Sequence, residues 1–359
     1  MNYGLLKYSY TSKYLYTNIG DEIQSLAAQR FLPHVDYYIF REKMNEFRSN
    51  DHEKVKMILN AWYMFCPENF PPSEDIDPLL LSMHFAEKIR RKIEKSRRAR
   101  DYLISHGPVG CRDESTMKFL LENSIPAYFS GCLTTTLIPN ENLRKKREAE
   151  YILCVDVSDE VYDYVSQRAE KPVYRLTKNF SPMFGSKSRF EIAKIMLYTY
   201  HNAYAVITGN LHTAMPCLAF GTPVCLIDKK KYDGRFDGTE EWVRHCPEQE
   251  FLGGGFYDFN TPPDNPEKFI PFRDSLAEKC RAFTGFDSGR SLFEDDYRPD
   301  LFSLLSMMAE SYEGSRRVIL RTPGKYLLKI GVKKLLHKVL PSVFGECSMY
   351  ALSEEDESK

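Results

Sequence analysis

The sequence lacks paired cysteines. Its nine cysteines form no C-x-x-C pair and no closely spaced framework, and they are scattered through apolar segments. An odd, dispersed set of this kind is typical of reduced thiols in a cytosol-like compartment. We therefore predict neither a disulfide-stapled module nor a zinc site, and no His/Cys/Asp cluster predicts another metal.

The sequence also lacks an excess of either charge. Lysine and arginine number 49, aspartate and glutamate 50, and the formal net charge is -1, so nothing global predicts binding to nucleic acid. The composition, 43% hydrophobic and 28% charged, is that of a globular protein. A length of 359 residues favours two domains over one.

Neither a signal peptide nor a membrane-spanning helix is predicted. The N-terminal residues lack the basic stretch, apolar run and cleavage site of a signal peptide. The uncharged stretch from Ile195 to Ile227 is long enough to cross a bilayer, but it contains turn residues such as Asn202, Gly209 and Pro216. These divide it into strand, turn and helix, so we predict a buried core unit and expect a soluble, cytoplasmic protein.

Short β-branched or aromatic runs alternate with helical patterns through most of the chain, which predicts α/β architecture with parallel sheets. Strands that are apolar almost throughout are expected where helices cover both faces of a sheet. The candidate strands are Gly4–Tyr10, Val35–Phe40, Val55–Ala61, Leu79–Met83, Tyr102–Ile104, Ala127–Phe129, Tyr151–Val157, Val173–Leu176, Tyr204–Thr208 and Val224–Ile227. The candidate helices include Asp21–Phe31, Asp113–Asn123, Asp159–Glu170, Ser188–His201 and Thr213–Phe220.

The pattern restarts after the charged stretch Asn140–Glu150, which predicts an interdomain linker. We predict a Rossmann-like, doubly wound domain over residues 1–145, a second over residues 146–310, and a terminal segment over residues 311–359. Two such domains leave a cleft between the carboxyl ends of their sheets, where ligands of open α/β sheets bind.

The terminal segment contains a basic amphipathic pattern. The range Arg316–Lys338 carries lysines and arginines but no acidic residue, with leucines and valines at helical spacing on one face. A basic amphipathic helix fits an anionic membrane surface. The alternative is a terminal helix that docks by its apolar face and leaves its lysines solvated.

The first candidate site motif is Asn18-Ile-Gly-Asp21, which precedes a candidate helix. Gly20 permits a tight turn, and the positive end of the helix can receive an anion. Asp21 is either the N-cap of the helix or a general base directed into the cleft.

The second motif, Gly107–Ser115, ends a strand and begins a helix. It leaves Arg112 at the edge of the cleft, where a planar guanidinium suits a carboxylate or a phosphate. The alternative is a surface Arg112 paired with Glu114. The nearby run Ser130–Thr136 contains hydroxyls, Thr134 among them, that either bind a ligand or satisfy the chain at the linker.

The third motif, Val206–Thr213, runs from a buried strand through a glycine turn into a helix. A helix N-terminus disfavours the imidazolium, so His212 is expected to be neutral and able to accept a proton. Pro216 is compatible with a helix that begins near Thr213, because first-turn amides need no partner within the helix. The alternative is a satisfied core histidine. Each motif follows a candidate strand, so we expect all three to meet in one cleft.

At these residues the chain resembles the polysaccharide pyruvyltransferase family. The resemblance rests on N-x-G-D-E (Asn18–Glu22), on V-G-x-R-D-x-S/T (Val109–Ser115) with the G-C-x-T turn (Gly131–Thr134), and on T-x-x-L-H-x-A-x-P-x-L-A-x-G-x-P-V (Thr208–Val224). The segment from Leu59 to His84 resembles one branch of that family. The ordered set lies within residues 1–230 and is far more specific than any single piece.

The resemblance implies two Rossmann-like domains of the GT-B glycosyltransferase type. It also implies transfer of the enolpyruvyl group of phosphoenolpyruvate to two hydroxyls of one sugar, which leaves a pyruvate ketal in a surface or capsular polysaccharide. Asn18, Asp21, Arg112 and His212 would line the site. Our hypothesis is that His212 is the general acid/base, Asp21 the base or orienter of a sugar hydroxyl, and Arg112 a clamp on an anionic group. No metal and no cofactor besides the donor substrate is implied.

One position departs from the family pattern. The family usually has Arg just before the Leu-His pair, where this chain has Asn210. Lys187 and Arg189, which precede a candidate helix, are candidates for the missing positive charge; the alternative there is a solvated loop. If the terminal helix binds a membrane, the expected acceptor is a lipid-linked oligosaccharide.

Two other functions stay open. A nucleotide-sugar-dependent glycosyltransferase can use the same two-domain scaffold, because a fold does not fix a function. A non-catalytic glycan-binding relative would keep the core and lose the donor site.

Overall fold

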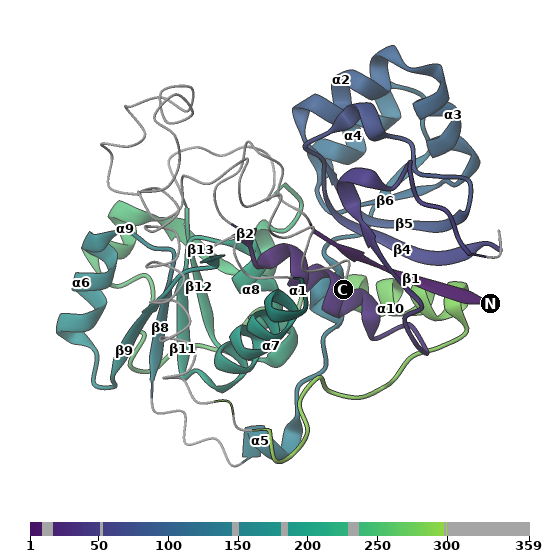
Figure 1. Ribbon diagram of the computed structural model, residues 1–359. Coiled ribbons are helices and arrows are strands. Elements are labelled where there is room, and N and C mark those ends of the chain that lie inside the picture. Colours follow the sequence, from purple (N-terminus) through teal and green to yellow (C-terminus); the bar gives the residue numbers. More distant parts are fainter. Residues whose placement is uncertain are drawn as a thin grey trace, which may run out of the picture.

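The computed structural model describes residues 1–8, 17–50, 53–145, 151–180, 186–228, 237–297 and 299 (Figure 1). The predicted basic helix at Arg316–Lys338 and the rest of the predicted terminal segment lie outside these residues. Within them the chain forms two parallel sheets with helices on their faces, so the predicted α/β fold class is confirmed.

The first sheet has the strand order β3-β1-β4-β5-β6-β7, and all of its neighbouring strands are parallel. This is a doubly wound order: strands are added on one side of β1 and then, starting with β4, on the other side. The carboxyl ends of the strands at this switch point are the expected ligand edge. The strands are β1 (Asn2–Lys7), β3 (Tyr37–Phe40), β4 (Val55–Tyr63), β5 (Ile76–Phe85), β6 (Val109–Cys111) and β7 (Ala127–Phe129).

The second sheet repeats this arrangement. Its order is β13-β12-β11-β8-β9, again all parallel, and the reversal lies between β8 and β11. The strands are β8 (Ile152–Val155), β9 (Val173–Leu176), β11 (Ala205–Thr208), β12 (Val224–Asp228) and β13 (Arg244–Pro247). The two-strand pair β2 (Thr17–Asn18) and β10 (Asn179–Phe180) is antiparallel and links the two units.

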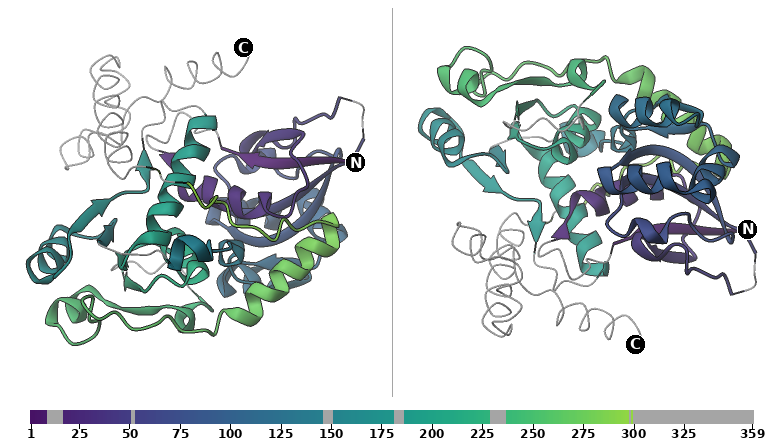
Figure 2. Two further views of the ribbon diagram at one scale, coloured as in Figure 1. Left: turned by 90° about the horizontal axis from the view of Figure 1, so that it is seen from below. Right: turned by 90° about the horizontal axis from the view of Figure 1, so that it is seen from above.

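Helices cover the outer faces and fill the space between the sheets (Figures 1 and 2). The outer face of the first sheet packs on α2 (Glu87–Lys95), α3 (Arg97–Ser105) and α4 (Glu114–Glu122), and that of the second on α6 (Asp159–Arg168) and α9 (Glu248–Gly253). Between the sheets lie α1 (Gly20–Gln29), α7 (Ser186–Asn202) and α8 (Leu211–Phe220). Shorter segments are η1 (Arg41–Lys43), η2 (Pro67–Asn69), η3 (Leu133–Thr136), α5 (Glu141–Lys145) and η4 (Glu240–Trp242).

One apolar core joins the two units. Its buried members include Ile23 of α1, Ile58 and Leu81 of the first sheet, and Leu153 and Val206 of the second. Because both sheets bury a face in the same cluster, the hydrophobic effect holds the ligand edges of the two units beside each other.

The helix α10 (Ile270–Thr284) follows the second sheet in sequence but packs on the first unit (Figure 2). The Tyr3 hydroxyl donates to the carbonyl of Thr284 at 3.3 Å, and Lys56 Nζ donates to that of Phe283 at 2.6 Å. Leu276 is buried in the shared core. The predicted boundaries at 145 and 310 stay predictions, and the chain crosses between the units more than once.

The structure corrects one predicted strand and adds elements that the sequence pattern did not reveal. Tyr102–Ile104 lies in α3, because Ala99 and Leu103 are four residues apart and both are buried on one helical face. The strands β6 and β13, three and four residues long, were not predicted. The helices α2 and α10 were also missed.

The uncharged stretch from Ile195 to Ile227 holds the end of α7, then β11, α8 and most of β12, as the predicted core unit requires. In the part of the chain that the structure describes, no helix has the length and apolar character needed to span a bilayer.

Replacing Leu276 with alanine should lower the free energy of unfolding by ~2–5 kcal/mol, because the cavity opens in the core that both units share. Urea denaturation would measure the change. Glu278→Ala, on the exposed side of the same helix, is the matched control and should stay within about 0.5 kcal/mol of the wild type. Equal losses in the two variants would show that α10 does not pack on the first unit.

Candidate active site

His212 is the second residue of α8, at the end of the loop that follows β11. The helix begins at Leu211 with Asn210 as its N-cap, two residues earlier than predicted. Pro216 therefore lies inside the helix and not in its first turn, so it has no N–H to donate to the carbonyl of His212 four residues before it. The imidazole is half-buried, which rules out a histidine sealed in the core.

The imidazole of His212 lies directly against the backbone of Gly20, the first residue of α1. A Cβ atom at Gly20 would stand 2.5 Å from Cγ of His212, closer than any side chain allows. Gly20 is thus required for the close approach of the ring. This contact brings the first and third sequence motifs together, one from each unit.

Gln24, one turn further along α1, orients the imidazole. Its Nε2 lies 3.4 Å from Nδ1 of His212, and because an amide nitrogen can only donate, Nδ1 is the acceptor. The neutral ring then carries its proton on Nε2. Asn60 fixes Gln24 in turn: its Nδ2 donates to the carbonyl of Gln24 at 2.9 Å and to Oε1 at 3.3 Å.

One of the two predictions for Asp21, that it is the N-cap of α1, is wrong. Ile19 occupies that position, and the side chain of Asn18 accepts from the N–H of Gly20 at 3.1 Å. The Asp21 carboxylate is buried and accepts from Nη1 of Arg41 at 3.3 Å. Burial raises the pKa of Asp21, although the charges of Arg41 and Arg112 lower it.

Arg112 follows β6 directly and is 3% exposed. The prediction of a surface Arg112 paired with Glu114 is wrong, since Glu114 pairs with Lys118 at 3.2 Å. Among the described residues, Nε of Arg112 has no hydrogen-bond partner although it is buried. Its charge acts on both Asp21 and Asp113, which balance it from a distance. A buried guanidinium that retains an unused donor is typical of a site for an anion.

Asn210 belongs to a polar cluster at the ligand edge of the second sheet. Its Oδ1 accepts from Nζ of Lys178 at 2.6 Å, and its Nδ2 donates to Asp156 at 2.7 Å. Asp156, directly after β8, also accepts from the hydroxyl of Thr177 at 2.6 Å. Lys178 therefore places an ammonium group beside Asn210.

The other predicted site residues lie elsewhere. Arg189 forms a buried ion pair with Glu22 at 2.9 Å and donates to the carbonyl of Tyr8. Burial raises the pKa of Glu22 to about 7, against the lowering effect of Arg189. Lys187 is exposed near the start of α7. Thr134 is fully buried, 3.1 Å from the thiol of Cys132, in the layer behind Gln24.

Sequence reasoning missed Gln24, Arg41 and Lys178. Gln24 lies four residues after Gly20, so helical spacing could have placed it on the same face as the glycine. Lys178 lies two residues after a correctly predicted strand. Arg41 has no sequence signal, because its partners Asp21 and Trp62 come from other elements.

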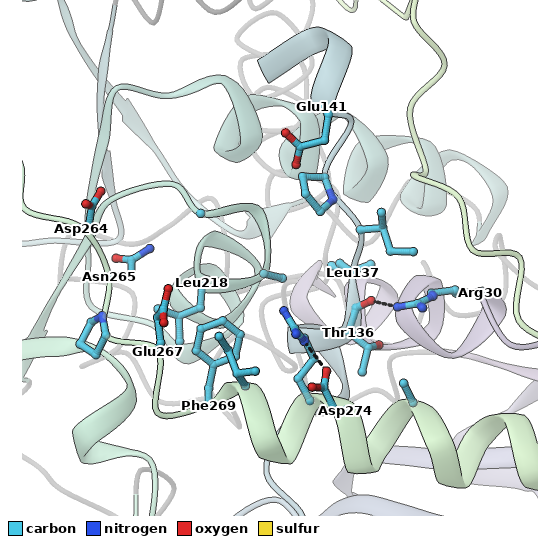
Figure 3. A pocket seen from close by; sticks show the side chains of 18 of the residues that line it. Arg30, Thr136, Leu137, Glu141, Leu218, Asp264, Asn265, Glu267, Phe269 and Asp274 are labelled. Atoms are coloured by element: carbon cyan, nitrogen blue, oxygen red, sulfur yellow. Dashed lines mark hydrogen bonds and ion pairs between the residues drawn. The ribbon is translucent and has the colours of Figure 1, made fainter. Parts of the chain in front are cut away.

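A large cavity lies away from these residues (Figure 3). It measures about 760 Å³ and opens between η3, α10 and the carboxyl end of α8, whereas His212 is at the amino end of that helix. The charged side chains that line it are mostly paired: Arg30 bonds to Thr136 and to Asp287, and Arg273 to Asp274. Across the described ranges, no three His, Cys, Asp or Glu side chains are grouped to hold a metal ion.

A family model described as polysaccharide pyruvyl transferase matches residues 18–230. The match begins at Asn18 and contains every residue of the site described above. Among curated proteins, none matches the chain.

Solved structures similar to this chain share little of its sequence. A functionally uncharacterised protein from Klebsiella pneumoniae subsp. pneumoniae has a TM-score of 0.44 and 11% identity, over 68% of this chain and 92% of that one. The wall teichoic acid polymerase TagF has a TM-score of 0.35 and 9% identity, over 87% and 89%. The Escherichia coli heptosyltransferase WaaC has a TM-score of 0.26 and 11% identity, over 80% and 100%. The fold is defined by the strand orders of the two sheets.

Replacing Gly20 with alanine should destabilise the protein by ~1–3 kcal/mol, because the new methyl group overlaps the His212 ring. In a His212→Ala background the same change should be neutral or stabilising, since alanine is the better helix former. Urea denaturation of the four proteins would measure the coupling energy. The same loss in both backgrounds would contradict the contact.

Proposed function

The chain belongs to the polysaccharide pyruvyl transferase family, and on that premise we propose that it transfers the enolpyruvyl group of phosphoenolpyruvate to two hydroxyls of one sugar. The products are a cyclic pyruvate ketal on the acceptor and phosphate. The acceptor is a sugar of a polysaccharide or of its lipid-linked precursor.

The observation that carries this proposal is the buried guanidinium of Arg112. It lies within electrostatic reach of Asp21, and Asp21 is the neighbour of the glycine that contacts His212. Phosphoenolpyruvate is a small donor with a carboxylate and a phosphate, and a guanidinium binds either group through paired N–H donors. The unused Nε donor of Arg112 suits such an anion.

In this proposal His212 protonates the methylene carbon of the donor. The C3–H bond forms and C2 becomes electrophilic, so that a sugar hydroxyl attacks it and forms the first C–O bond. The C2–O bond to phosphate then breaks as the second hydroxyl forms the second C–O bond. His212 gives up this proton as the imidazolium and becomes the neutral ring, and Gln24 supports the role because its amide group lies 3.4 Å from Nδ1 and orients the imidazole.

Asp21 orients or deprotonates a sugar hydroxyl in the same proposal. Burial raises its pKa despite the opposing charges of Arg41 and Arg112, and a carboxylate with a raised pKa is a stronger base near neutral pH. Arg41 holds it in place from the first unit.

Lys178 supplies the positive charge that the family pattern has at position 210. Its Nζ is held by Asn210 and lies 3.4 Å from Asp156, at the amino end of α8. Asp156 also receives bonds from Thr177 and Asn210, so the lysine is one of several donors that balance it. The ammonium group and the helix terminus together favour an anion.

In this proposal the protein meets its acceptor at the surface of a membrane. The basic range Arg316–Lys338 would hold the protein at an anionic leaflet, where lipid-linked oligosaccharides are built. This part of the proposal rests on sequence alone.

The activity is tested by phosphate release from phosphoenolpyruvate with a panel of hexose and N-acetylhexosamine glycosides, and by mass spectrometry of the ketal. His212→Gln should lower kcat by ~10²–10⁴-fold, as expected for loss of a general acid/base. His34→Gln, an exposed histidine paired with Asp36, should leave kcat unchanged.

Turnover of a UDP- or GDP-sugar in place of phosphoenolpyruvate would contradict the proposal and favour a glycosyltransferase. Acceptor binding without turnover of any donor would favour a non-catalytic relative.

The role of Lys178 is tested by moving the charge. Lys178→Gln should raise the KM for phosphoenolpyruvate by ~10–10²-fold, the value of a hydrogen bond to a charged group. Adding Asn210→Arg to this variant should restore much of the loss. Lys171→Gln, at the opposite end of β9 against Tyr204, is the matched control. An unchanged KM in Lys178→Gln would remove the lysine from the donor site.

A further inference from the structure

A second histidine lies at the carboxyl edge of the first sheet, on the strand next to the one that leads to Arg112. His84 is at the carboxyl end of β5, and its Nδ1 lies 2.6 Å from Oδ2 of Asp113. We propose that His84 is a second catalytic group, the base that removes a proton from an acceptor hydroxyl, and that Asp113 is the residue that positions it. This inference rests on the proposed pyruvyl transfer and assigns a residue to its acceptor step.

The geometry of the pair is that of an oriented imidazole. Asp113 is fully buried and caps α4 through Oδ1, which accepts from the N–H of Thr116 at 2.8 Å. Burial raises the pKa of Asp113, but the hydrogen bond to His84 and the charges of His84 and Arg112 have the larger effect. The pKa is therefore below its ordinary value, and the carboxylate is ionised. An ionised carboxylate can only accept, so Nδ1 of His84 donates and, in the neutral ring, Nε2 is the basic atom.

The pair belongs to the site and not to a separate part of the core. Asp113 follows Arg112 in sequence, and the charge of Arg112 acts on both Asp113 and Asp21. His84 is paired in register with Trp62 on the neighbouring strand, and the carbonyl of Trp62 accepts from Arg41, the partner of Asp21. His84 is 5% exposed, close to the 4% of Asp21 and the 3% of Arg112.

The surroundings of His84 suit a sugar. The half-buried rings of Trp62 and Phe65 lie 4.4 Å apart, centre to centre, and both contact the guanidinium of Arg41. Aromatic faces with polar groups at their rim bind molecules that have one apolar and one polar side. A pyranose ring, with its C–H face and its hydroxyls, is such a molecule.

Ketal formation needs more than one proton-transfer group. The first hydroxyl loses its proton as its oxygen bonds to C2, and the donor C3 gains a proton in the same step. If His212 delivers the proton to C3, it cannot also accept the hydroxyl proton. His84 accepts that proton while Asp21, held by Arg41, acts as the orienter of the hydroxyl, and the second hydroxyl proton leaves with the phosphate. The two imidazoles return to their starting states by exchange with solvent, so atoms and charge balance.

The charge environment of His84 determines the pH dependence. The ionised Asp113 stabilises the imidazolium, and Arg112 opposes it. Arg90 of α2 also lies near, since it donates to the carbonyl of Phe85 at 2.7 Å and to the hydroxyl of Thr116 at 3.4 Å. Removing the charge of Asp113 should therefore favour the neutral form of His84.

The test compares His84→Gln and Asp113→Asn with the wild-type protein, using phosphoenolpyruvate and the glycoside on which the wild type is most active. His84→Gln should lower kcat by ~10²-fold or more while stabilisation by phosphoenolpyruvate alone in a thermal-shift assay is kept. Asp113→Asn should lower kcat by about tenfold; asparagine keeps the cap of α4, and the unfolding midpoint, measured beside kcat, should fall because the charge that balances Arg112 is lost. It should also move the acid limb of the kcat profile to lower pH.

The control is His106→Gln. His106 contacts Tyr102 at the C-cap of α3, at the opposite end of the first unit's strands, and its loss should not alter kcat. A kcat for His84→Gln within about twofold of the wild type would overturn the role of His84, and so would an unshifted pH profile for Asp113→Asn. Wild-type protein that releases no phosphate from phosphoenolpyruvate would overturn the proposed function itself, which separates the two failures.

Discussion

The contact between the imidazole of His212 and the backbone of Gly20 is the constraint on which the site depends. It occurs between the amino ends of two helices, α1 from the first unit and α8 from the second. Because α1 begins there, its next residues reach different partners: Asp21 meets Arg41, Glu22 meets Arg189, and Gln24 meets His212. One helical turn thus positions groups from both units. A larger residue at position 20 would separate them.

The buried charges of the site divide into those already satisfied and those that are available. Arg41 donates to Asp21, to Glu42 at 2.8 Å and to the carbonyl of Trp62. Arg112 is equally buried, yet its Nε has no partner among the described residues. A protein stabilises a buried cation with hydrogen bonds wherever it can, so the unused donor of Arg112 supports the proposal that this arginine binds an anion.

Much of this could be predicted from the sequence. The motifs at Asn18–Asp21, Arg112 and His212 each follow a strand, and parallel strands bring such loops to one edge, so their meeting was foreseeable. The partners were not, because Arg41, Asn60 and Lys178 come from elements far apart in sequence. The helix that contains Tyr102 was misread because a three-residue aromatic and aliphatic run fits a strand as well as a helix. His84 lay in a segment that only the family resemblance marked, and its pairing with Asp113 required coordinates.

The return of α10 to the first unit has a mechanical consequence. The chain passes from the first unit to the second after η3, back to the first at α10, and then to α7 again, where the ring of Phe293 packs on Tyr198 and His201. Three crossings leave the halves little freedom to drift apart. The entropic cost of bringing the side chains of the two units together is therefore largely met during folding. A substrate that binds between the units then meets side chains that are already in place.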